Sequence, residues 1–155
     1  KFNLVYTNVG DFMIKYESLK LDNQLCFSLY ALSREIIKLY KPLLDELNLT
    51  YTQYLVMLVL WEEEKTTVKN IGTRLHLDSG TLTPLLKKLE ANELIRRYRS
   101  KEDDRVVIVE LTSKGEELQD KAKDVPGKML CKMYLEEDKV VDLKKELDNV
   151  LNQLK

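Results

Sequence analysis

The fold is decided by residues 94–112, LIRRYRSKEDDRVVIVELT. Within this stretch, Leu94 to Arg99 and Arg105 to Leu111 are rich in residues that favour β-strands. The five residues between the two runs are too polar to lie in a core. The pattern therefore predicts a β-hairpin with a charged tip that projects from the domain.

Two short helices are predicted immediately before this hairpin. A helix capped by Thr67 is followed by a turn at residues 76–78. The next helix begins at Asp78 or Ser79 and runs to about residue 92. Two short helices joined by a tight turn are typical of a helix-turn-helix.

Longer helices are predicted toward the N-terminus. From Asp22 onward the apolar residues recur every three or four positions, which predicts a long helix that is kinked or ends near Pro42. Residues 50–53, TYTQ, match a capping box and predict a second helix to about Glu63.

Two further helices are predicted toward the C-terminus. Residues 113–116, SKGE, match another capping box and open a helix that ends before Pro126. Apolar residues from Val140 to Leu154 recur near a seven-residue repeat, so this helix and the first one can form a dimer surface. The predicted fold class is mainly α with a small two-stranded hairpin wing.

We expect residues 13–155 to form one domain. The winged helix-turn-helix occupies about residues 50–112, and residues 22–46 and 113–155 supply dimerisation helices. Met13 is a candidate natural start, which would make residues 1–12 a leader.

The composition excludes several classes of protein. With 155 residues, 44% hydrophobic and 33% charged, the chain can bury one core and is neither disordered nor disulfide-framed. No run approaches the roughly 18 consecutive apolar residues of a membrane helix. The N-terminus lacks a secretory pattern, which predicts a cytoplasmic protein.

Metal binding and catalysis are not expected. Cys26, His76 and Cys131 lie far apart in the sequence and form none of the close pairs typical of zinc sites. No cofactor is predicted. A thiol peroxidase needs a hydroxyl and a cationic donor close to its cysteine, and residues 22–25 supply neither; no Ser-His-Asp or Cys-His arrangement is credible either.

The charge distribution points to DNA. Residues 65–101 carry nine Lys or Arg and three acids, a net +6, so the other residues sum to −7. A basic face alone is often only solvated, but here it coincides with the helix-turn-helix and hairpin. The expected base contacts are Ser79, Thr81 and Thr83; the phosphate contacts are Lys87 and Lys88; and the hairpin contacts are Arg97, Arg99, Lys101 and Arg105.

At this point the sequence resembles a known family. Residues 103–112, DDRVVIVELT, match the DxRx5LT wing signature of MarR-type winged-helix transcription regulators. The segments DNQLCF (22–27), YKPLL (40–44) and LDSGTLTPLLK (77–87) are similar to the organic hydroperoxide-sensing branch, OhrR. The resemblance covers roughly residues 21–125.

The resemblance implies a homodimeric repressor of a peroxide-detoxifying gene, bound to an inverted-repeat operator and released by organic peroxide. Its reactive cysteine would be Cys26, hydrogen-bonded by Tyr30 and Tyr40 of the partner subunit. Asp103 and Arg105 would form a salt bridge that stabilises the wing.

The position of Cys26 fits this role. It falls in the first turn of the predicted helix, where free amides and the helix dipole favour the thiolate that attacks a peroxide. Without the resemblance, a small buried core residue is the commoner fate of such a cysteine.

Cys131 has two interpretations. It is either an inert residue or, as the resemblance to the two-cysteine subclass implies, the partner of Cys26 in an intersubunit disulfide. A Cα separation beyond about 7 Å in the reduced state would then require helices to move.

Other functions stay open at this stage. A MarR-type repressor can instead respond to a phenolic or aromatic ligand, lined here by Tyr30, Tyr40, Tyr51, Tyr54 and Trp61. Ordinary core packing also explains aromatic residues at such spacing. A winged helix that contacts only protein would show no salt-dependent DNA affinity.

Overall fold

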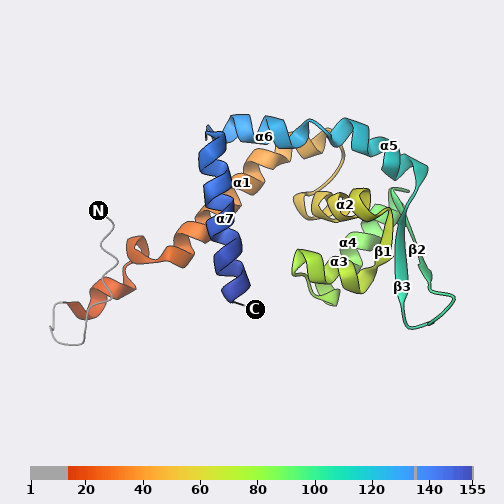
Figure 1. Cartoon of the computed structure of the whole chain (residues 1–155), viewed down its shortest axis with the longest axis horizontal. Coiled ribbons are helices and arrows are strands. Elements are labelled where there is room, and N and C mark those ends of the chain that lie inside the picture. The colour runs from red at the N-terminus through yellow and green to blue at the C-terminus, as the bar shows by residue number, and fades with distance from the viewer. Residues whose placement is uncertain (1–13, 135, 155) are drawn as a thin grey trace. The chain divides into compact units, whose positions relative to one another are not determined.

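The computed structural model describes residues 14–134 and 136–154. These residues fall into two compact units, which divide between Leu39 and Tyr40. The leader predicted at residues 1–12 lies outside the described residues. Along the described chain, the helices and strands follow in the order α1, α2, β1, α3, α4, β2, β3, α5, α6 and α7 (Figure 1).

The N-terminal unit begins with two 3-10 helices, Ile14–Leu19 and Leu21–Asn23, before α1 (Leu25–Asp45). The predicted start of α1 at Asp22 is therefore three residues too early. The side-chain amide of Asn23 donates to the Glu17 carbonyl at 2.8 Å, which ties this segment back to the first 3-10 helix. Such side-chain bonds to the backbone compete with α-helix formation.

Helix α1 continues through Pro42 instead of ending there. Proline removes one backbone hydrogen bond, to the carbonyl four residues earlier, and this loss falls on the exposed Lys38, where water can replace it. Beyond the proline, the helix buries Leu43 and Leu44 in the core of the second unit.

Helix α2 (Tyr51–Glu63) has the predicted capping box. The Thr50 hydroxyl accepts a hydrogen bond from the Gln53 amide at 3.4 Å, and the Gln53 Oε1 accepts one from the Thr50 amide at 2.8 Å. The helix is apolar on most sides, so it forms the centre of the core. The residues with no exposed surface come from four elements: Val56, Met57, Leu60, Ile71, Leu82, Leu86, Leu89 and Val109.

The helix-turn-helix consists of α3 (Val68–Leu75) and α4 (Ser79–Ala91). Thr67 caps α3, and Asp78 caps α4, as predicted. The turn requires close backbone approach at Gly72, where an added Cβ would lie 2.8 Å from the Leu77 carbonyl oxygen.

The sheet has three antiparallel strands in the order β1-β3-β2, and not the predicted two. These are β1 (Lys65–Thr67), β2 (Ile95–Arg99) and β3 (Val107–Leu111). Strand β1 has only three residues, too few to show an alternating pattern in the sequence. The loop between β2 and β3 extends beyond the strands as a wing (Figure 1). The winged helix-turn-helix fold is thus confirmed.

Three helices follow the wing: α5 (Ser113–Ala122), α6 (Val125–Met133) and α7 (Glu137–Gln153). The cap of α5 is Thr112, whose hydroxyl accepts from the Gly115 amide at 3.1 Å, so the capping box predicted at residues 113–116 is one residue too late. Thr112 is also the last residue of the wing signature, so the sequence pattern did not mark it as a helix cap. Among the described residues, no helix is long and apolar enough to cross a membrane.

Candidate nucleic-acid interface and redox site

The start of α4 is ordered by its own hydroxyl groups. Asp78 accepts hydrogen bonds from the Thr81 amide and hydroxyl, both at 2.9 Å, and these bonds lower the pKa of Asp78. The Thr83 hydroxyl donates to the Ser79 carbonyl at 2.7 Å. With Ser79, Thr81 and Thr83 all exposed, this turn presents methyl groups and oxygen lone pairs to solvent.

Two lysines follow on the same helix. Lys87 and Lys88 are both exposed, and Lys88 also lines a pocket beside the start of α2. The two lysines are consecutive residues, so their side chains point in different directions from the helix.

The wing carries its own ion pair. The Arg105 Nε lies 3.2 Å from Asp103 Oδ1. The hydrogen bond from the Arg105 backbone amide, followed by this side-chain contact, lowers the pKa of Asp103. The Arg105 side chain is still 92% exposed. Arg99 donates to the Asp104 carbonyl, and Lys101 is exposed at the tip.

Arg97 is positioned differently from the other wing arginines. Its guanidinium lies 2.6 Å from Glu90 Oε2, and its backbone amide donates to Glu90 Oε1 at 3.0 Å. Only 21% of its side chain is exposed. The ion pair joins β2 to α4 and leaves little of the Arg97 side chain exposed for contact with a partner.

Other basic residues in the charged stretch are also paired. Arg74 of α3 bonds Glu62 and Glu63 of α2, and Arg96 lies 3.0 Å from Glu110. Each of these pairs joins two different elements, 11 to 14 positions apart in the sequence. The net +6 of residues 65–101 therefore overstates the charge available to DNA, because the sequence does not show which acids lie opposite.

Cys26 is the second residue of α1 and is exposed. Tyr30, one turn further along, is 57% exposed and lies under Arg34, which donates to its hydroxyl at 3.0 Å. The Tyr30 oxygen is thus already an acceptor within its own subunit.

Tyr40, the other predicted hydrogen-bond partner of Cys26, belongs to an aromatic cluster with Tyr51 and Tyr54. Its ring centroid lies 4.9 Å from that of Tyr51 and 5.9 Å from that of Tyr54. Burial, followed by the neighbouring Tyr51 and Tyr54, raises the pKa of Tyr40 to about 12. Its phenol is protonated at neutral pH and can donate a hydrogen bond.

Tyr54 and Trp61, the last two residues of the predicted aromatic set, contact one another. Tyr54 is 2% exposed and contacts Trp61 edge to face, with centroids 6.2 Å apart. The Trp61 indole donates to the Gly115 carbonyl at 2.9 Å, which joins α2 to α5.

Cys131 lies on α6 and is exposed. It borders an open groove that Lys123, Lys128 and Lys132 also line. No group of three or more potential metal ligands occurs among the described residues.

Comparison with known proteins places this architecture in a family. The sequence profile of the transcriptional regulators SarA/Rot matches residues 38–122. The organic hydroperoxide resistance transcriptional regulator of Bacillus subtilis (strain 168) is 52% identical over 140 residues, covering 90% of this chain and 95% of the relative.

Two solved structures of AbfR, a protein of Staphylococcus epidermidis, are also similar. The reduced form bound to DNA has 38% identity and a TM-score of 0.74, covering 90% of this chain and 98% of AbfR. The disulfide form has 36% identity and a TM-score of 0.62, covering 91% and 99%.

The fold and the relatives together define a winged-helix transcriptional regulator. The chain belongs to the MarR-type family, in the branch of the organic hydroperoxide resistance regulators. The relatives are regulators and not enzymes, which agrees with the expectation from the sequence.

Proposed function

We propose that the protein is a cytoplasmic redox-sensing repressor that binds operator DNA as a reduced homodimer and releases it when an organic hydroperoxide oxidises Cys26. The observation that carries this proposal is the exposed cysteine at the start of α1 in a chain 52% identical to a hydroperoxide resistance regulator. The structures of AbfR in reduced DNA-bound and disulfide forms support the same cycle.

DNA contact is assigned to α4 and the wing. Ser79, Thr81 and Thr83 would face base edges, because small side chains at the start of a recognition helix approach bases closely. Lys87 and Lys88 would meet phosphates. Arg99, Lys101 and Arg105 at the wing would reach the minor groove, and Arg97 would support them through Glu90. An inverted-repeat operator fits two recognition helices spaced about 34 Å apart.

The sensing step is a two-electron oxidation of Cys26. Its thiolate sulfur attacks the terminal oxygen of the hydroperoxide, an S–O bond forms, and the O–O bond breaks. The alkoxide leaves as an alcohol after taking a proton, and Cys26 becomes a sulfenic acid. The free backbone amides at the first turn of α1 stabilise the attacking thiolate.

Phenol groups of the partner subunit would donate to the same sulfur. Tyr40 suits this role because its phenol is protonated at neutral pH and has a hydrogen to donate. The second donor predicted from the sequence is Tyr30. Its oxygen accepts a hydrogen bond from Arg34, and its hydroxyl hydrogen can still be donated to the sulfur. Tyr51, packed against Tyr40, is a second candidate.

Cys131 would complete the switch. Its thiolate attacks the sulfur of the Cys26 sulfenic acid in the other subunit, an S–S bond forms, and hydroxide leaves as water. The exposure of Cys131 on α6 supports this step. Formation of the disulfide would then change the spacing of the two winged domains.

The test is a non-reducing gel and a DNA-binding titration, each before and after one equivalent of cumene hydroperoxide. We expect a crosslinked dimer that requires both cysteines, and a roughly 5- to 150-fold loss of DNA affinity, the usual range of allosteric coupling. Cys26→Ser should bind DNA and ignore the peroxide. Cys131→Ser should react at Cys26 without crosslinking.

Two outcomes would contradict the proposal. If Cys26→Ser still releases DNA on treatment with peroxide, Cys26 is not the sensor. If the wild type does not respond to peroxide but responds to a phenolic compound, the protein is a ligand-controlled repressor instead.

A further inference from the structure

The first turns of α4 carry two threonines whose hydroxyl hydrogens are already used. The Thr81 hydroxyl donates to Asp78 Oδ2 at 2.9 Å, while the Thr81 amide donates to Asp78 Oδ1. The Thr83 hydroxyl donates to the Ser79 carbonyl at 2.7 Å. A hydroxyl group has one hydrogen and two lone pairs. In both threonines the hydrogen therefore points back to the chain, and only lone pairs remain for an outside partner.

Both hydrogen bonds resist replacement. The Thr81 bond is charge-assisted, because its acceptor is the carboxylate that caps the helix, and such bonds are roughly twice as strong as those between neutral groups. The Thr83 bond has the usual length of an O–H···O bond and joins residues one helical turn apart. A base would have to break one of these bonds before either hydroxyl could donate to it.

The two threonines lie on either side of the surface that α4 turns to solvent. Leu82 and Leu86 bury the opposite side of the helix. By the helical repeat, the exposed Gly80 and Pro84 lie between the threonines and have no polar side-chain group. Residues two positions apart do not share a helix face, so each threonine would meet a different base pair.

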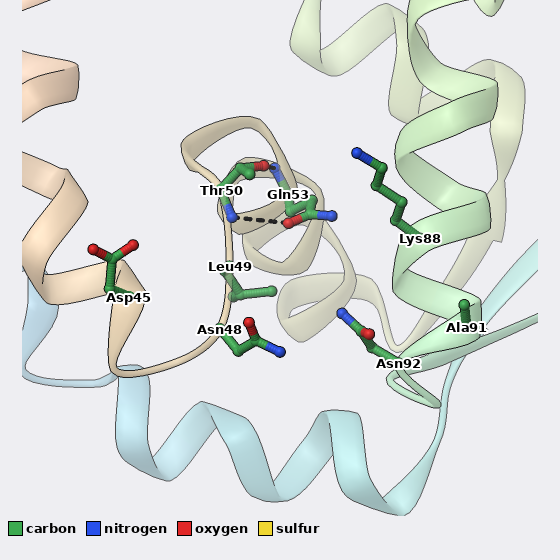
Figure 2. A pocket seen from close by; sticks show the side chains of 8 residues that line it. All are labelled: Asp45, Asn48, Leu49, Thr50, Gln53, Lys88, Ala91 and Asn92. Atoms are coloured by element: carbon green, nitrogen blue, oxygen red, sulfur yellow. Dashed lines mark hydrogen bonds between the residues drawn. The ribbon is translucent and has the colours of Figure 1, made fainter.

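The donor side chains of α4 lie further along the helix. Lys87 and Lys88 come more than two turns after the cap, and Figure 2 shows Lys88 extending toward Gln53 of α2. Ser79 shares the first turn, but the structure assigns its hydroxyl hydrogen to no acceptor among the described residues, so this hydroxyl can rotate to donate or accept. The two threonine oxygens are thus the groups whose direction is fixed.

In the major groove, each base presents either an amino group or a keto oxygen. Adenine N6 and cytosine N4 carry amino hydrogens, whereas guanine O6 and thymine O4 can only accept. An oxygen that offers only lone pairs is attracted to an amino group and repelled by a keto oxygen.

We propose that Thr81 and Thr83 determine base specificity as hydrogen-bond acceptors, each selecting at its own base pair the amino group of adenine or cytosine over a keto oxygen. The inference rests on the proposed function, because it takes α4 as the helix that enters the major groove. One such hydrogen bond should favour the amino group roughly 2- to 12-fold at that position.

The first experiment locates the two base pairs. The reduced full-length protein selects binding sites from random DNA duplexes, and the selection is repeated with Thr81→Val and Thr83→Val, which keep the side-chain shape without the oxygen. Each variant should lose base preference at one position of the half-site, and the two positions should differ. The control is Thr73→Val on α3, because its hydroxyl also donates to a carbonyl one turn back, that of Lys69.

Three outcomes are informative at this stage. Thr73→Val should keep every wild-type preference. If neither α4 variant changes a position, the inference is overturned while DNA binding stands. If the wild type selects no sequence at all, DNA recognition by α4 is wrong, and the proposed function and this inference fail together.

The second experiment removes the amino group from the DNA. At each located pair, purine replaces adenine, or 2-pyrimidinone replaces cytosine, which also identifies the base that supplies the amino group. The change should weaken binding of the wild type about 2- to 12-fold more than binding of the matching valine variant. Removing the keto oxygen of the paired base should weaken both proteins alike. An effect confined to the keto oxygen would overturn the inference.

The third experiment reverses the hydroxyl of Thr81. In Asp78→Asn the side-chain oxygen still caps the Thr81 amide, and asparagine is as good a cap as aspartate. Its amide nitrogen replaces Oδ2 and can only donate, so the Thr81 oxygen accepts and its hydrogen turns outward. At the Thr81 position the variant should prefer the pair with its amino and keto bases exchanged between the strands.

Base preference, and not affinity, is the measurement for this variant. Loss of the Asp78 charge raises affinity for every duplex alike, and a purely structural role of the cap would weaken binding to every duplex alike. Neither changes the preferred base. An unchanged preference at the Thr81 position in a folded Asp78→Asn protein would overturn the role of the committed hydrogen.

Discussion

Helices α2 and α7 both carry many apolar residues, yet the chain covers only one of them. Six residues of α2 are buried, whereas no residue of α7 is. On α7, Val141, Leu143, Leu147, Val150 and Leu151 are all 39% exposed or more. A helix with such a stripe is stable when another surface covers it. The comparison indicates that α2 is stabilised within one chain, and we propose that a second copy covers the stripe of α7.

The largest effect is expected from placing a charge in the α7 stripe. Leu147→Glu acts twice in a symmetric dimer and removes two buried leucines, about 3–6 kcal/mol from apolar burial alone. The dimer dissociation constant should rise at least about 100-fold, measured by analytical ultracentrifugation. Lys145→Glu introduces the same side chain two positions earlier and should remain dimeric. A dimeric Leu147→Glu would show that α7 is not the interface.

The core of α2 provides the next comparison. Leu60 has no exposed surface, and Leu58 on the same helix is 39% exposed. Leu60→Ala should reduce the free energy of unfolding by about 2–5 kcal/mol, because it leaves a cavity. Leu58→Ala should cost clearly less. Urea denaturation monitored by the fluorescence of Trp61 measures both, and similar losses would contradict the central role of α2.

Two glycines extend the contrast to α5 and α6. A Cβ added at Gly115 would lie 2.1 Å from the Leu94 carbonyl oxygen, whereas one at Gly127 would meet nothing within 4 Å. Gly115→Ala should therefore destabilise the protein by about 1–3 kcal/mol or more through overpacking. Gly127→Ala should stabilise it by about 0.4–1 kcal/mol, since alanine lowers the entropy of the unfolded chain. Thermal unfolding gives the sign of each change.

Much of this fold could be predicted from local patterns. The cap residues Thr50, Thr67 and Asp78 form short-range hydrogen bonds that the sequence shows directly. Strand β1 could not be predicted in this way, because its three residues become a strand only by pairing with β3, more than 40 positions away.

The site was less predictable than the fold. The sequence showed that residues 65–101 are basic, but it did not show that Arg97 lies against Glu90. It also did not show that Tyr40 packs against Tyr51 and Tyr54. These contacts depend on tertiary packing, which composition and spacing do not record.

The smallest effect is expected from the Glu90–Arg97 pair, and it should depend on pH. The hydrogen bonds from Arg97 lower the pKa of Glu90 below its ordinary value of 4.5. The carboxylate therefore stabilises the folded protein above pH 4.5, and this stabilisation is lost as the pH falls through the lowered value. Glu90→Gln should cost about 1 kcal/mol or less at pH 7, after allowance for solvent screening, and less still in acid.

The control for this prediction is Glu46→Gln, a change at an exposed residue beyond the end of α1. Its stability should follow that of the wild type across the same pH range, measured by urea denaturation at pH 7 and pH 3.5. A constant loss in Glu90→Gln at both values would mean that the carboxylate charge plays no part. In that case β2 would be held to α4 by packing and backbone bonds alone, and Arg97 would be available to DNA after all.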